Sequence, residues 1–258
     1  MTDQLQLAID GSVAVLTIDN PPANTWTLES LNALPDLLAD LESDASIRAL
    51  VVTGAGEKFF SAGAELRTFA DGDVAIASEM ARAFGFAFEA LAECDLVTIA
   101  AINGYAMGGG LETALACDIR IAESHAQMAL PEASVGLLPC AGGTQRLPWL
   151  VGEGWAKRMI LCGERLDADT ALDIGLVEEV VDSGEAVAVA QELANRVQKQ
   201  APGSVVACKR LIHAAERQPL QTALAMEREE FVELFNSDDQ LEGVTAFLEK
   251  RAPEWTNG

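Results

Sequence analysis

Two glutamates in apolar surroundings are the residues of this sequence whose type and position best fit catalysis. Glu112 follows a run of three glycines in the stretch NGYAMGGGLETALACD at residues 103–118. Glu132 lies in the apolar stretch MALPEASVGLLP at residues 128–139. A carboxyl group is costly to bury unless it is hydrogen-bonded or its pKa is raised. Two such groups form a candidate acid–base pair, although their sequence spacing does not show whether they meet.

The glycine run has a chemical interpretation as well. Gly108, Gly109 and Gly110 lie between a predicted strand and a predicted helix, at the N-terminus of that helix. Unpaired backbone N–H groups and the positive end of the helix dipole lie there, and glycine lets a ligand approach them. A second glycine-containing loop, at residues 58–66, follows another strand. Two N–H groups aimed at one point would form an oxyanion hole.

A purely structural interpretation of these residues stays open at this point. The glycines would then only allow tight packing of the strand against the helix, and Glu112 would help to cap that helix. Glu132 would be an exposed residue at a helix N-terminus. The elements around the two glutamates therefore have to decide their role.

The segments that position these residues alternate between strands and helices. Asp10-Gly11 is a turn dipeptide between two apolar runs, which predicts a hairpin. Helical periodicity covers residues 27–43, with Thr27 as the N-cap and Pro35 at the position of a kink, and a second helix covers residues 74–94. Buried strands are predicted for IRALVVTG, LVTIAAIN and CDIRIA. This alternation predicts an α/β fold with a mainly parallel sheet covered by helices.

The C-terminal part of the chain is predicted to be helical. Helical patterns run from about Gly154 onward, interrupted by one strand-like segment at residues 175–181. Ser237 and Asp238 are suitable capping residues for the last helix. The helices carry apolar stripes that a small region cannot easily bury alone, which indicates an oligomer.

Composition excludes several classes of function. The formal net charge of −23, from 40 acidic and 17 basic residues, would repel a nucleic acid. Five cysteines without a C-x-x-C pair, and only two histidines, argue against a disulfide framework and a metal site. The N-terminus lacks the pattern of a signal peptide, and Asn103 and Glu112 interrupt the most apolar window, residues 96–117. We expect a cytoplasmic protein with no bound metal and no membrane contact.

Two nucleotide-binding motifs and one hydrolase motif are also excluded. The stretch VVTGAGEKF offers G-x-G after a strand, but Phe59 stands where a dinucleotide fingerprint needs its third glycine. The sequence contains no G-x-x-x-x-G-K-[ST] and no G-x-S-x-G. A P-loop and a nucleophile elbow are therefore absent from it.

Several long motifs in a fixed order identify a family resemblance. The chain resembles the crotonase superfamily, and most closely its enoyl-CoA hydratases, over nearly its whole length. The motifs that carry the resemblance are PPANTWTLESLNAL, GEKFFSAGAEL, AAINGYAMGGGLETALACDIRIA, PEASVGLLPCAGGTQRLP, GLVEEVV and FLEKRAPEW.

The resemblance implies a fold and a class of substrate. It implies a spiral of ββα units at residues 1–200, followed by a helical trimerisation region at residues 201–258. The protein would be a homotrimer or a dimer of trimers. Its substrate would be an acyl thioester of coenzyme A, with no separate cofactor, because coenzyme A is part of the substrate.

The resemblance also assigns roles to individual residues. The two N–H groups of the oxyanion hole fall on Ala64 and Gly109, and the two catalytic glutamates fall on Glu112 and Glu132. Glu112 would take a proton from the water that adds to C3, and Glu132 would hold this water and deliver a proton to C2. Contacts with coenzyme A are implied for Lys58, Ala62, Leu66 and Arg67, and for Lys250 on a neighbouring subunit.

Two residues depart from the pattern of these hydratases. Cys140 stands where they usually have glycine, near the water; a positive φ would strain a cysteine there, and its side chain would make the pocket smaller. Trp255 replaces the phenylalanine of their final motif. The resemblance implies that the helix at residues 74–94 shapes the acyl pocket, but this helix carries no signature of acyl-chain length.

Three functions are compatible with the resemblance. Hydration of a 2-enoyl-CoA is favoured because both glutamates are present. A 3,2-enoyl-CoA isomerase or another lyase of the superfamily would use Glu132 alone. A non-catalytic scaffold or RNA-binding homologue is disfavoured by the intact site and by the net charge of −23.

Overall fold

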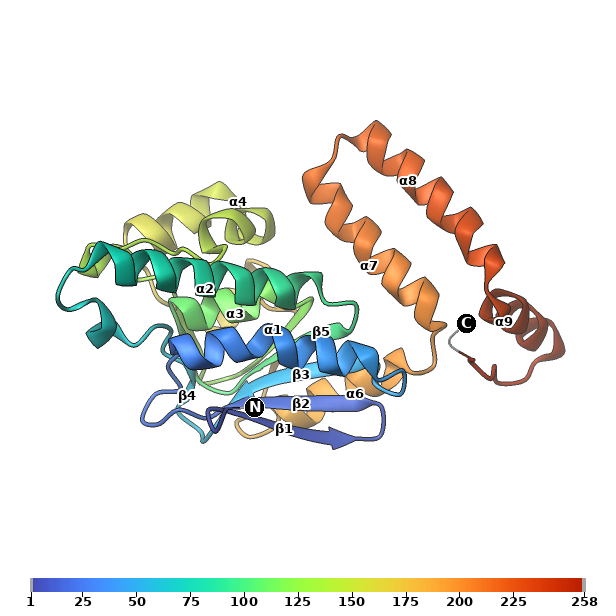
Figure 1. Ribbon diagram of the computed structural model, residues 1–258, viewed down its shortest axis with the longest axis horizontal. Coiled ribbons are helices and arrows are strands. Elements are labelled where there is room, and N and C mark those ends of the chain that lie inside the picture. Colours follow the sequence, from blue (N-terminus) through green and yellow to red (C-terminus); the bar gives the residue numbers. More distant parts are fainter. Residues whose placement is uncertain (1, 257–258) are drawn as a thin grey trace. The chain divides into compact units, whose positions relative to one another are not determined.

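The chain folds into a mixed α/β part followed by a part made of helices. The computed structural model, shown in Figure 1, describes residues 2–256. It contains two compact units, the first ending at Ala194 and the second beginning at Asn195. All the strands described below lie in the first unit, which therefore contains the sheets on which the candidate site is built.

The large sheet of the first unit has six strands in the order β1-β2-β3-β5-β7-β10. The predicted hairpin at Asp10-Gly11 is confirmed, since β1 and β2 pair antiparallel around a turn in which Gly11 has a φ of 59°. The remaining neighbours pair in parallel, as expected. The strands are β1 (Leu5–Asp10), β2 (Val13–Ile18), β3 (Ala49–Gly54), β5 (Val97–Ile102), β7 (Ile119–Glu123) and β10 (Glu179–Val181).

A second, smaller sheet was not predicted from the sequence. Its order is β4-β6-β8-β9, with parallel pairs β4·β6 and β6·β8 and an antiparallel pair β8·β9. Strands of two or three residues are too short to show an alternating pattern, which explains the omission. They are β4 (Phe59–Ser61), β6 (Tyr105–Met107), β8 (Gln127–Ala129) and β9 (Leu166–Asp167).

The two sheets are linked by a repeated ββα connection. In β3-β4-α2, β5-β6-α3 and β7-β8-α4, the first strand belongs to the large sheet and the second to the small sheet. The helices are α2 (Val74–Glu93), α3 (Gly109–Ala116) and α4 (Gly143–Leu161). This arrangement is the spiral that the family resemblance implied.

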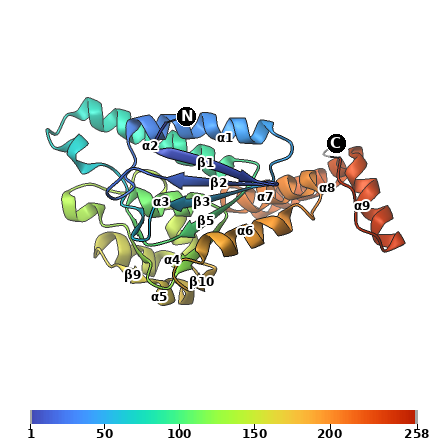
Figure 2. The ribbon, with the colours of Figure 1, turned by 90° about the horizontal axis from the view of Figure 1, so that it is seen from below.

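The helices of the first unit begin close to the predicted positions, with one exception. α1 (Leu28–Ser43) contains Pro35 and starts at the N-cap Thr27, whose side chain accepts from the N–H of Ser30. α4 begins at Gly143, eleven residues before the predicted helical region, and is interrupted at Gly152, which has a φ of 75°. α1 and α2 pack together and cover the same face of the large sheet, as Figure 2 shows. The short elements are η1 (Leu66–Phe69), η2 (Glu132–Val135), α5 (Ala168–Asp173) and α6 (Ala186–Val197).

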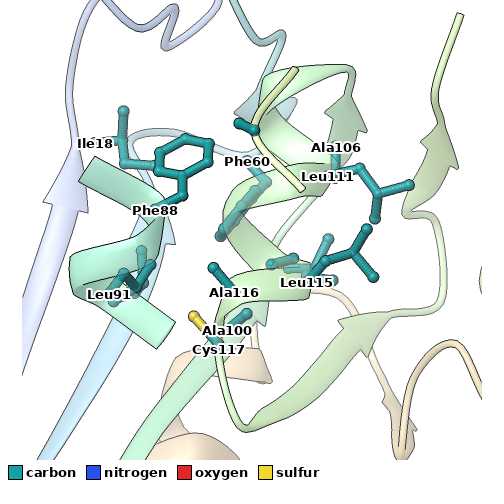
Figure 3. Packing of buried hydrophobic residues seen from close by; sticks show 14 of the residues in the cluster. Ile18, Phe60, Phe88, Leu91, Ala100, Ala106, Leu111, Leu115, Ala116 and Cys117 are labelled. Atoms are coloured by element: carbon teal, nitrogen blue, oxygen red, sulfur yellow. The ribbon is translucent and has the colours of Figure 1, made fainter. Parts of the chain in front are cut away.

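The hydrophobic core of the first unit joins α2 and α3 to the strands. Figure 3 shows Phe88 and Leu91 of α2 in one buried cluster with Phe60, Leu111 and Leu115. These side chains are almost completely removed from solvent. Burying them stabilises the unit by about 2 kcal/mol for each large side chain.

One buried polar contact fixes α3 against the segment before α1. Trp26 is fully buried and meets Phe88 edge to face at 5.4 Å. Its indole Nε1–H donates to Thr113 Oγ1 at 3.0 Å, and the Thr113 hydroxyl donates to the carbonyl of Gly109 at 2.8 Å. The core therefore holds the first turn of α3 in place.

In the described part of the second unit, the end of α6 is followed by three helices and a 3-10 turn. The helices are α7 (Pro202–Arg217), α8 (Leu220–Glu233) and α9 (Asp238–Glu249), with η3 (Leu234–Asn236) between the last two. Ser237 is the N-cap of α9, as predicted, and accepts from the N–H of Gln240. Phe231, Phe235 and Phe247 leave their rings largely exposed. Over residues 2–256, we find no helix with the length and apolar character of a transmembrane span.

Candidate active site

Two glycine-containing loops of the small sheet lie in direct backbone contact. A Cβ added to Gly63 would lie 2.7 Å from the carbonyl oxygen of Met107 and 2.8 Å from the nitrogen of Gly109. A Cβ added to Gly110 would collide with the carbonyl oxygen of Ser61. Gly63 also has a φ of +83°, which strains any other residue. Glycine is therefore required here because the two loops approach more closely than a side chain allows.

This approach brings the N–H groups of Ala64 and Gly109 to one region. Ala64 forms a parallel bridge with Trp26 in which Gly63 and Glu65 supply the hydrogen bonds, so its own N–H points away from Trp26. Gly109 is the first residue of α3, where N–H groups have no partner within the helix. Among residues 2–256, neither N–H has a hydrogen-bond acceptor. Both residues line one cavity, so two free donors lie at its wall.

Glu112 lies in the first turn of α3 and is buried, with only 2% of its surface exposed. Its Oε1 accepts from the backbone N–H groups of Ala141 and Gly143, both at 2.8 Å. Desolvation raises the pKa of the Glu112 carboxyl, while the two N–H donors and the charge of Arg146 oppose this rise. The carboxyl is thus held in a fixed orientation by two donors that favour its ionised form.

Glu132 is the first residue of η2 and is only partly buried. A Cβ on Gly108 would lie 2.9 Å from Glu132 Oε1, so the glycine makes room for this carboxyl. Within the described residues, the buried Oε2 has no hydrogen-bond partner. Desolvation, and then the negative charge of Glu112, raise the pKa of Glu132 to about 7.

The two glutamates therefore have contrasting surroundings within one site. Both line the same cavity, and the charge of one acts on the other. Glu112 receives two N–H donors on one oxygen, whereas an oxygen of Glu132 is buried without a partner. Burial raises the pKa of both carboxyl groups, and the two N–H donors on Glu112 oppose that rise. The ionised form is therefore favoured at Glu112 by contacts that Glu132 lacks.

The cavity has a volume of about 610 Å³ and lies in the first unit. One wall comes from the loops around Ala64 and Gly109, and another from the segment that contains Glu132 and Cys140. The third wall comes from α2, the helix expected to shape the acyl pocket. The residues in it, which the sequence did not identify individually, are Ala77, Met80, Ala81 and Phe84. These residues recur at helical spacing beside the core-facing stripe of α2, which is the signal that could have revealed them.

Cys140 lines the cavity together with both glutamates. Desolvation, and then the charges of Glu112 and Glu132, raise the pKa of the Cys140 thiol to about 11. The thiol is therefore neutral at physiological pH. Cys140 does not have a positive φ, so the backbone strain that such an angle would cause does not arise here.

The residues expected to contact coenzyme A are not all in the cavity wall. Ala62 and Leu66 line it, and Leu66 leaves 54% of its surface exposed. Lys58 and Arg67 are exposed outside the wall, Lys58 with its Nζ over the ring of Phe59. Lys250 is the C-cap of α9 in the second unit, with a left-handed φ of 58°. Their roles in binding stay predictions.

Comparison with known proteins places this site in a family. The family model described as "Enoyl-CoA hydratase/isomerase" matches residues 8–258. The chain belongs to the enoyl-CoA hydratase/isomerase family. The "Short-chain-enoyl-CoA hydratase" of Clostridium acetobutylicum is 40% identical over 246 residues, which cover 95% of this chain and 94% of that protein.

Solved structures of family members have the same fold. The structure of Pseudomonas aeruginosa DspI is 64% identical, with a TM-score of 0.97, and the match covers 98% of this chain and 97% of that one. The enoyl-CoA hydratase from Bacillus anthracis is 35% identical, with a TM-score of 0.95, covering 99% of this chain and all of the other. The mixed α/β spiral described above is therefore the crotonase fold.

Proposed function

We propose that this enzyme is an enoyl-CoA hydratase, which adds water across the double bond of a 2-trans-enoyl-CoA to give a 3-hydroxyacyl-CoA. The observation that carries the proposal is the presence of two differently stabilised carboxyl groups and two free N–H donors in the wall of one cavity. Family membership and the hydratases among the relatives support it.

The thioester carbonyl would accept hydrogen bonds from the N–H groups of Ala64 and Gly109. Negative charge grows on this oxygen as water adds to C3, so fixed donors stabilise the enolate-like state more than the substrate. Loss of one such donor costs about 3 kcal/mol in a comparable oxyanion hole. The glycines of both loops leave room for this approach.

The two carboxyl groups would divide the transfer of protons. Glu112, stabilised as a carboxylate by two N–H groups, takes a proton from the water whose oxygen bonds to C3. Glu132, whose pKa of about 7 leaves it protonated in about half of the molecules at neutral pH, delivers its proton to C2. One hydrogen and one hydroxyl group are thereby added to the substrate, and proton exchange between the carboxyl groups restores the starting state.

The direct test follows the ultraviolet absorbance of the conjugated thioester with crotonyl-CoA and a longer 2-enoyl-CoA. We expect the absorbance to fall and the product to gain the mass of one water. Glu112→Gln and Glu132→Gln should each lower turnover by about a hundred-fold or more, as loss of an acid–base group does. Glu79→Gln, an exposed residue of α2 outside the cavity, is the matched control.

The outcome also separates hydration from its alternative. An isomerase of the same family would leave 2-enoyl-CoA unhydrated and would convert a 3-enoyl-CoA with Glu132 alone. Near-normal turnover by either glutamine variant would contradict the assigned role of that residue.

We further propose that the protein is a homotrimer or a dimer of trimers in the cytoplasm, without a cofactor, nucleic-acid partner or metal. The exposed rings of Phe231, Phe235 and Phe247 support subunit association, because apolar side chains gain stability when a partner covers them. Light scattering should give a mass three or six times that of the 27.3 kDa chain. A monomer mass would contradict this proposal.

A further inference from the structure

The cavity extends well beyond the two glutamates along one face of α2. Ala77, Met80, Ala81 and Phe84 all line it, and their spacing places them on one side of the helix. Phe84 marks the reacting end, since a Cβ on Gly109 would lie 2.9 Å from Phe84 Cε1. The wall therefore runs from the free N–H of Gly109 towards the N-terminal part of α2.

Another part of the cavity wall consists of apolar side chains that remain exposed. Val135 leaves 54% of its surface exposed and Leu138 leaves 65%, and Leu137 lies between them in sequence and in the same wall. The only carboxyl groups in the described wall are Glu112 and Glu132, at the reacting end. Nothing ionised in this wall would oppose an apolar ligand along the rest of the groove.

The length of this groove corresponds to a chain much longer than crotonyl. Seven residues separate Ala77 from Phe84, which is about 10 Å along the helix at 1.5 Å per residue. An extended chain advances about 1.2 Å per bond, so the groove spans about eight or nine bonds. An acyl chain of about ten carbons would reach from the oxyanion hole to Ala77.

The volume of the cavity leads to a similar estimate of the acyl-chain length. If each carbon with its hydrogens occupies about 30 Å³, the share of one water molecule, a four-carbon acyl group takes about 120 Å³ and a ten-carbon group about 300 Å³. The cavity of about 610 Å³ holds the longer group with space left for the thioester end and the water. A four-carbon group would leave most of the apolar wall in contact with solvent.

We infer that the preferred substrates carry a linear acyl chain of about ten carbons, and that Ala77 and Ala81 set the length that fits. The inference rests on the proposed function for its chemistry, but the groove itself does not depend on the reaction. Alanine at these two positions keeps the path along α2 open, where a larger side chain would close it. The acyl chain covers the exposed faces of Val135 and Leu138.

The first experiment measures kcat/KM for 2-trans-enoyl-CoA substrates of four to sixteen carbons. Complete burial of one methylene corresponds to about a four-fold gain, and a groove open on one side should provide about two-fold. We expect kcat/KM to rise about sixty-fold from four to ten carbons and then to level off. Equal values, or a preference for four carbons, would overturn the inference.

Two variants test the positions that limit the length. Ala81→Phe should lower the ratio of kcat/KM between ten-carbon and four-carbon substrates at least ten-fold. Ala77→Phe should lower kcat/KM only for longer acyl chains. The longest chain that it accepts should be about five carbons longer than the longest chain that Ala81→Phe accepts, because the two residues lie about 6 Å apart along the helix. Ser78→Phe places the same bulk on the exposed helix outside the cavity wall and should keep the parent ratio. Identical profiles in all three variants would contradict the assignment.

A binding measurement separates this inference from the proposed reaction. Calorimetric titration with saturated butyryl-CoA and decanoyl-CoA requires no chemistry. If no substrate is hydrated but decanoyl-CoA binds more tightly and Ala81→Phe removes the difference, the groove stands and the hydratase proposal fails. If crotonyl-CoA is hydrated and the two saturated ligands bind equally, hydration stands and the inference fails.

Discussion

Glu132 should make the stability of the folded protein depend on pH, and Glu132→Gln should remove that dependence. Its pKa rises from an ordinary value of 4.5 to about 7 in the folded chain, because burial and the charge of Glu112 disfavour ionisation. Below pH 4.5 the carboxyl is protonated in both states and contributes no difference. Between 4.5 and 7 the unfolded chain loses its proton first, so the free energy of unfolding falls as pH rises. Above pH 7 the loss is complete.

The magnitude follows from the two pKa values. The difference between 4.5 and about 7 corresponds to about 3 kcal/mol. Since part of the Glu132 side chain contacts solvent, screening reduces the expected loss to about 2 kcal/mol. Glutamine resembles the protonated acid at every pH, so the variant should match the parent near pH 4.5 and exceed its stability by about 2 kcal/mol at pH 8.

Urea denaturation at pH 4.5, 6, 7 and 8 provides the measurement. One protein concentration is used throughout, because subunit association would add to the apparent stability. The free energy of unfolding of the control Glu79→Gln, a change at an exposed residue, should differ from that of the parent by the same amount at all four pH values. A Glu132→Gln protein that gains no stability between pH 4.5 and 8 would refute the assignment of a raised pKa to Glu132.

Three further predictions concern the reaction, the core and the binding of coenzyme A. In the parent, kcat/KM should decline above about pH 7, as Glu132 loses the proton that it donates, and a profile that rises steadily to pH 9 would contradict this role. Thr113→Val should lower the free energy of unfolding by about 2 kcal/mol, because the buried Nε1–H of Trp26 loses its acceptor. The double variant Thr113→Val/Trp26→Phe should recover part of that loss, and urea denaturation of both variants measures the difference. Lys58→Ala and Arg67→Ala should raise KM for acyl-CoA without lowering kcat, and the effect should shrink at high salt; an unchanged KM would exclude a contact with phosphate.

The sequence predicted the parts of the fold that have a long repeating pattern. α2 has twenty residues and an apolar stripe, and β3 is buried along its whole length, so periodicity and composition located both. β4, β6 and β8 have only three residues each, too few for a pattern to emerge. The small sheet, which supports both glycine loops, could be expected only through the family resemblance.

The sequence identified the residues of the candidate site but not the contacts between them. Glu112 and Glu132 were selected because carboxyl groups are unusual in apolar segments. That Ala141 and Gly143 donate to Glu112 depends on a contact across about thirty residues, which no local pattern reveals. The helix α2 was expected to shape the acyl pocket, but the residues that line it were not identified, because its apolar residues also fit an ordinary helix.

The two free donors at the cavity wall belong to the main chain of Ala64 and Gly109. Among the twenty amino acids only proline lacks a backbone N–H, so every other substitution leaves these donors in place as long as the loops keep their close approach. Catalytic side chains, in contrast, can be exchanged one codon at a time. Engineering that moves or replaces the carboxyl groups on this scaffold should therefore redirect the chemistry of an acyl thioester while the capacity to stabilise its enolate is inherited unchanged.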